Sequence, residues 1–122
     1  MLTNTVLREQ LNRLDMKPSA LAIRNINRAL DGMQTHQLDA TLLDYYQGAL
    51  RILWLGEFNS HREVSMNFTN GGLVICFAYE HSVMTKMWDV SDLANETRTV
   101  LTLTLSESLE FIRHSIWANH DV

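Results

Sequence analysis

The spacing of apolar residues changes near the middle of the chain, and this change limits the fold more than any other sequence feature. Up to Leu55 the large apolar side chains recur every three or four residues, as they do on a helix. From Val64 to Phe68 they alternate with polar ones, as on a strand with one buried face. The sequence therefore predicts an α+β domain in which helices come first and a sheet follows.

Three helices are predicted before the sheet, over residues 3–15, 19–30 and 38–55. Pro18 suits the first turn of the second helix, and Asp31-Gly32 supplies a stop after it. The third helix would carry apolar side chains around more than half of its circumference. We therefore expect it to be the central helix of the core, packed on two sides and ended by Gly56.

The first two strands are predicted over residues 62–69 and 73–80, around Asn70-Gly71. This dipeptide is the preferred pair of a two-residue type I′ hairpin turn, which would pair Thr69 with Gly72. The large apolar residues of both strands would then share one face, with Phe68 opposite Leu73. The other face of the return strand would carry a second set of apolar side chains: Val74, Cys76 and Ala78.

The remaining segments predict an irregular strand over residues 84–89, a strand over 98–105 and a C-terminal helix over 107–118. In the last strand Leu101, Leu103 and Leu105 would face inward, and Ser106 would cap the helix. The sheet would thus have three or four antiparallel strands. Residues 1–122 are expected to form a single domain, and a hydrophobic share of 46% allows a core without metal or disulfide.

No sequence pattern indicates catalytic, metal or cofactor chemistry. The five histidines include no pair at the spacing that places two ligands on one helix face. Cys76 lies in an apolar strand, where a thiol behaves as a small hydrophobic group, and Gly71-Gly72 lacks the lysine of a phosphate loop. We therefore expect a non-enzymatic protein that uses no cofactor and no metal.

The cysteine count and the distribution of apolar residues favour the cytoplasm as the location of the protein. A single cysteine excludes an intrachain disulfide, the chain opens without a basic and apolar leader, and no apolar run reaches the length of a membrane span. We accordingly expect no membrane partner.

The strand 73–80 is apolar on both faces, and such strands are usually covered on both sides. The favoured arrangement places the N-terminal helices on one face of the sheet and the C-terminal helix on the other. The alternative places all helices on one face, so that a partner covers the second. The candidate residues for binding a partner are those on the second strand face and two aromatic residues of the last helix: Val74, Cys76, Ala78, Phe111 and Trp117.

Charge is distributed unevenly, with five basic and three acidic residues in 1–35 and five against eleven in the remainder, for a net charge of −4. Residues 7–32 also have the order of a helix-turn-helix reader, so the candidates for contact with DNA are Arg24, Arg28, Asn25 and Asn27. The usual glycine between the two helices is absent, and basic residues are few for phosphate binding.

These observations together favour a small regulatory or interaction protein that binds another protein, of the inhibitor, immunity or adaptor type. Its size would suit an accessory protein of a bacterium or a mobile element, and the partner could be a second copy of the chain in a homodimer. A DNA-binding transcriptional regulator is the alternative function. A cofactor-free enzyme is the third.

Overall fold

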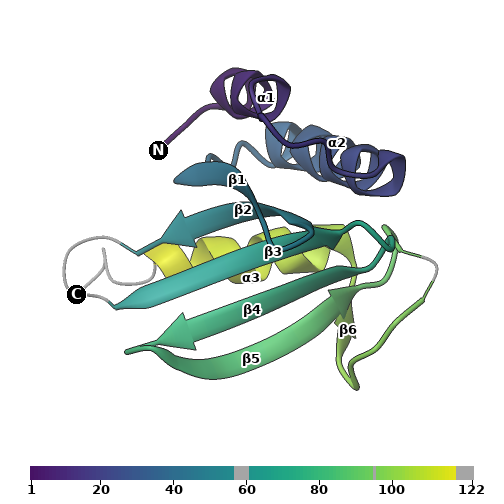
Figure 1. Cartoon of the computed structure of the whole chain (residues 1–122). Coiled ribbons are helices and arrows are strands. Elements are labelled where there is room, and N and C mark those ends of the chain that lie inside the picture. The colour runs from purple at the N-terminus through teal and green to yellow at the C-terminus, as the bar shows by residue number, and fades with distance from the viewer. Residues whose placement is uncertain (57–60, 95, 118–122) are drawn as a thin grey trace.

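The computed structural model describes residues 1–56, 61–94 and 96–117, and it describes residue 117 by its backbone alone. The elements follow one another as α1 (Asn4–Asn12), α2 (Ala20–Thr35), β1 (Leu42–Tyr46), β2 (Ala49–Leu55), β3 (Arg62–Thr69), β4 (Val74–Glu80), β5 (Val83–Val90), β6 (Thr102–Leu103) and α3 (Leu105–Trp117). The strands form one sheet in the order β1-β2-β3-β4-β5-β6 (Figure 1). Every pair is antiparallel except β5 and β6, which run parallel. The predicted α+β class is confirmed.

The first two helices begin where the sequence predicts. Hydroxyl side chains cap both, because Thr3 accepts a hydrogen bond from the Val6 N–H and Ser19 from the Ala22 N–H. The predicted stop at Asp31-Gly32 is wrong, since α2 continues to Thr35. A Cβ at Gly32 would lie 2.7 Å from Leu105 Cδ2 of α3. The glycine therefore permits close helix packing and does not end the helix.

The predicted central helix over residues 38–55 is wrong, because this segment forms the β1–β2 hairpin. Gln47 and Gly48 have φ of 49° and 80°, the left-handed pair of a type I′ turn, and Tyr46 pairs with Ala49 across it. Strand β2 buries Leu50, Ile52 and Trp54 on one face. Its other face carries Leu53, which is also buried. With apolar residues on both faces, the segment lacks the alternation of a strand and resembles a buried helix in sequence.

The β3–β4 hairpin is present, but its predicted register is wrong by one residue. The connection is a three-residue loop, in which the Gly72 N–H donates to the Thr69 carbonyl and Gly72 has a φ of 94°. Phe68 therefore lies opposite Val74, and Met66 opposite Cys76. Because side chains alternate between faces, this shift turns the whole of β4 over.

The predicted strand over residues 98–105 is reduced to Thr102–Leu103, and α3 begins at Leu105. The predicted cap, Ser106, is replaced by Thr104. The Glu107 N–H donates to Thr104 Oγ1 at 3.1 Å, and the Thr104 N–H donates to Glu107 Oε1 at 3.0 Å. This reciprocal pair is a capping box. Leu101 does not face inward as predicted but is 39% exposed.

The favoured arrangement with helices on both faces of the sheet is also wrong. Helices α2 and α3 contact each other, and both contact β2 and β3, so they lie on the same face. In Figure 1, α3 lies behind the sheet, α1 and α2 lie beyond β1, and no helix crosses the near face. Helix α1 covers the edge at β1, where the Leu43 N–H donates to Gln10 Oε1 at 3.0 Å. The core lies between the helices and the even-numbered side chains of the central strands. We call the opposite side of the sheet the open face.

Candidate functional site on the open face of the sheet

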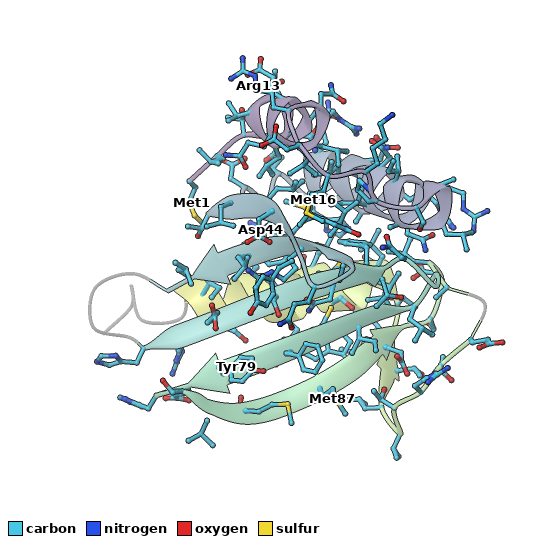
Figure 2. All side chains as sticks on the ribbon, in the orientation of Figure 1. Met1, Arg13, Met16, Asp44, Tyr79 and Met87 are labelled. Atoms are coloured by element: carbon cyan, nitrogen blue, oxygen red, sulfur yellow. The ribbon has the colours of Figure 1, made fainter. Side chains whose placement is uncertain are left out.

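The open face is built by the odd-numbered side chains of β2, β3 and β4, which the register places in rows. One row contains Leu53, Ser65 and Phe77, and the rows on either side end in Ile75 and Tyr79. Figure 2 shows Tyr79 and Met87 on this side of the molecule, together with Asp44 of β1. Strand β4 thus offers three large apolar side chains to a surface that no helix covers.

A shallow groove of about 400 Å³ runs across these rows. Its apolar wall is formed by Tyr46, Leu53, Ile75, Phe77 and Tyr79. Its polar lining includes Arg51, Glu63, Ser65 and Asn67. A concave surface with aromatic side chains and a few polar groups is typical of a site that binds a ligand or a protein segment.

The basic group of the groove is already paired. Arg51 donates from Nε and Nη2 to the two carboxylate oxygens of Asp44, at 2.8 and 2.6 Å. Its guanidinium carbon lies 5.0 Å from the centre of the Tyr46 ring. The hydrogen bonds with Asp44 raise the pKa of Arg51 above its ordinary value. Glu63, in contrast, makes no ion pair with another described residue, although its charge also helps to raise the pKa of Arg51.

Exposed apolar side chains extend from the groove to the edge of the sheet at β5. Met87 lies opposite Phe77 and is 39% exposed. Met84 of the same strand lies opposite Tyr79 and is more exposed still. Val100 and Leu101 are also exposed, beside the point where the Leu101 carbonyl accepts a hydrogen bond from Asp89. Exposed apolar side chains that gather beside a groove are typical of interaction surfaces.

A pair of histidines lies at one end of the open face, and the sequence analysis missed it. His61 and His81 face each other across the end of the β3–β4 ladder, with ring centroids 4.7 Å apart. His61 lines a cleft of about 310 Å³ with Glu63, Tyr79 and Ser82. The signal that could have found the pair is the hairpin register, which brings together residues that are distant along the chain.

The strand residues predicted to bind a partner lie in the core. Val74 and Cys76 are fully buried and Ala78 is 5% exposed, beneath the helices of the chain itself. The one-residue shift of register places them there and turns Ile75, Phe77 and Tyr79 outward. Burial raises the pKa of the Cys76 thiol well above its ordinary value, which suits a packing role.

Of the two aromatic residues of α3 that were predicted to bind a partner, Phe111 and Trp117, the structure describes the side chain of Phe111 only. Phe111 is half-buried, packs edge to face against Trp88 with ring centroids 5.0 Å apart, and is covered by the Lys86 ammonium at 4.1 Å. It belongs to the edge of the core. Trp117 ends α3, and its side chain lies outside the described residues.

The residues considered for DNA contact are not all on one surface. Asn25 is buried, and its side-chain amide donates to the Gly72 carbonyl at 3.3 Å. The Asn27 side-chain oxygen accepts a hydrogen bond from Arg8 Nη1 at 2.7 Å, and Arg28 donates to the Asp92 carbonyl at 2.9 Å. Arg24 is exposed and lines a cleft of about 270 Å³ together with Arg98 and Glu96. The amide groups that would read bases are therefore occupied within the fold.

Among residues 1–56, 61–94 and 96–117, no group of three or more histidine, cysteine, aspartate or glutamate side chains is placed to hold a metal ion. No helix in the described part of the chain has the length and apolar character needed to cross a bilayer. In comparisons with known proteins, no family model, no curated protein and no solved structure matches the chain.

Proposed function

We propose that the chain is a small non-enzymatic regulatory or interaction protein that binds another protein through the open face of its sheet. The observation that carries the proposal is a concave strand surface, free of helices, with Leu53, Ile75, Phe77 and Tyr79 in one groove. Strands that are apolar on both faces are usually covered on both, and the helices of this chain cover only one. A protein partner supplies the second layer.

The charge of the groove favours a partner of opposite sign. The carboxylate of Glu63, which forms no ion pair with another described residue, lies beside the apolar wall, and the chain as a whole has a net charge of −4. A partner segment with a large apolar side chain and a neighbouring lysine or arginine would fit both features. We place this interaction in the cytoplasm, where the free thiol of Cys76 stays reduced.

Affinity capture with matched variants tests the proposal. Wild type is compared with Phe77→Glu on the open face and with Ile23→Glu, which changes an exposed residue of α2. We expect the same bound protein with wild type and with Ile23→Glu, and at least tenfold less with Phe77→Glu. Circular dichroism confirms that the variants are folded. Equal capture by all three proteins would contradict the proposal.

Light scattering after size exclusion identifies the case in which the partner is a second copy. A dimer that Phe77→Glu converts to a monomer, and that Ile23→Glu leaves intact, would assign the open face to self-association.

A further inference from the structure

The histidine pair at the end of the β3–β4 ladder carries an inference that is independent of the protein-binding proposal. Arg62 pairs with Glu80, and the next residues outward are His61 and His81. The His81 N–H donates to the His61 carbonyl at 2.8 Å, and the ring planes are inclined by 32°. The two imidazole rings therefore lie side by side just beyond the end of the regular ladder.

Local backbone requirements do not explain the choice of histidine at either position. His81 and Ser82 have φ of 52° and 65° and form the two-residue turn between Glu80 and Val83, where asparagine, aspartate and glycine are preferred. His61 has a φ of 51°, an uncommon conformation for a residue other than glycine. Both residues are exposed, so core packing does not explain them either.

We propose that His61 and His81 together bind one divalent first-row transition metal ion, through one ring nitrogen each. Neutral imidazole is a good ligand for zinc, nickel and copper. With ring centroids 4.7 Å apart, one nitrogen of each ring can reach a shared ion at about 2.0–2.1 Å.

Water completes the coordination of this ion, because no third ligand is placed beside the pair among the described residues. Glu63 and Tyr79 line the same cleft and belong to the groove of the open face as well. The open coordination positions therefore lie at one end of the surface assigned to the protein partner. The sequence expectation of no metal considered only helical spacing, which does not detect a pair formed across two strands.

The helix layer contains a second pair of histidines that serves as a matched control. His36 lies 3.6 Å and His114 3.9 Å from the two carboxylate oxygens of Glu110. His36 also lies 3.1 Å from Ser106 Oγ. Each of these imidazoles therefore lies near a carboxylate oxygen of α3, and no ring contact joins the two among the described residues.

The test uses the full chain without an affinity tag. Zinc chloride is titrated calorimetrically into wild type, His61→Ala/His81→Ala and His36→Ala/His114→Ala, and circular dichroism confirms the fold of each. We expect the first double variant to bind zinc at least tenfold more weakly than wild type, and the second to bind within twofold of it. Unchanged zinc affinity in His61→Ala/His81→Ala would overturn the proposal.

Paramagnetic broadening locates the ion independently. With a substoichiometric amount of copper(II), we expect the amide signals of residues 61–63 and 79–82 to broaden first in a proton–nitrogen correlation spectrum. Broadening that begins around His36, Glu110 and His114 would assign the ion to the helix layer and overturn the proposal.

Discussion

The indole of Trp88 makes the buried polar contact that joins the sheet to α3. Its N–H donates to Ser108 Oγ at 2.9 Å, both side chains are fully buried, and the Ser108 hydroxyl donates to the Thr104 carbonyl at 2.7 Å. Ser108→Ala leaves the indole N–H without an acceptor. We expect the free energy of unfolding, measured in urea, to fall by about 1–3 kcal/mol. Exposed Ser91→Ala should change it by about 0.5 kcal/mol or less, and equal effects would contradict this account.

The capping box of α3 predicts a specific dependence on pH. The hydrogen bond from the Thr104 backbone N–H lowers the pKa of Glu107 from its ordinary value of 4.5. A carboxyl group with a lowered pKa in the folded state stabilises the fold above its unfolded pKa, and loses this effect as the pH falls through the folded value. We therefore expect Glu107→Ala to lower the melting temperature at pH 7 and to lower it much less at pH 3. An equal decrease at both values would contradict the assignment.

The two glycines of the β3–β4 loop should differ in their tolerance of a side chain. Gly72 has a φ of 94° and its Cβ would lie 3.3 Å from Leu21 Cδ1, whereas Gly71 has no positive φ and its nearest neighbour would lie 3.9 Å away. A left-handed conformation costs a non-glycine residue about 1–2 kcal/mol. We expect Gly72→Ala to reduce the unfolding free energy by about this amount, and Gly71→Ala to change it little. The reverse order would restore the two-residue turn predicted from the sequence.

Among the elements, the β1–β2 hairpin can be distinguished from the predicted helix by a single substitution at Gly48. Gly48 has a φ of 80° in the turn. If residues 38–55 were a helix, Gly48→Ala would stabilise the protein by about 1 kcal/mol through helix propensity. In the observed turn the same change imposes a left-handed alanine, and we expect a loss of about 1–2 kcal/mol in thermal or urea unfolding. A stabilising Gly48→Ala would contradict the hairpin.

Local chemistry explains which elements the sequence could predict. The helical spacing of the first apolar residues, Pro18 and the alternation in β3 are short-range signals, and they predicted α1, the start of α2 and β3. Strand β2 could not be recognised, because Leu50, Ile52, Leu53 and Trp54 face both sides of the sheet and remove the alternation. Gln47-Gly48 was the remaining signal of a turn, and glutamine is not among the residues that typically begin one.

The candidate site depended on a single residue of register. The sequence showed that β4 is apolar on both faces, but a two-residue turn and a three-residue loop place opposite sets of side chains in the core. Asn70-Gly71-Gly72 is compatible with both connections. In the structure Gly72 packs against Leu21 and accepts a hydrogen bond from Asn25, both residues of α2. These contacts favour the three-residue loop, and they depend on tertiary packing that the local sequence does not reveal.

For the whole molecule, the central feature is a single helix layer on a sheet whose second face is left without one. The close packing of Gly32 against Leu105 keeps α2 and α3 together on that layer. The helices consequently cannot cover Ile75, Phe77 and Tyr79, which line the groove together with Glu63. Our account holds that a protein partner binds this surface.

Site-specific photo-crosslinking tests that claim most directly. A benzophenone amino acid replaces Phe77 on the open face or, as a control, Ile23 on the exposed side of α2, and each protein is irradiated in the cells that naturally produce it. The account predicts a covalent adduct of defined mass from position 77 and none from position 23. An adduct from position 23 with none from position 77 would show that the helix layer, and not the open face, is the interaction surface.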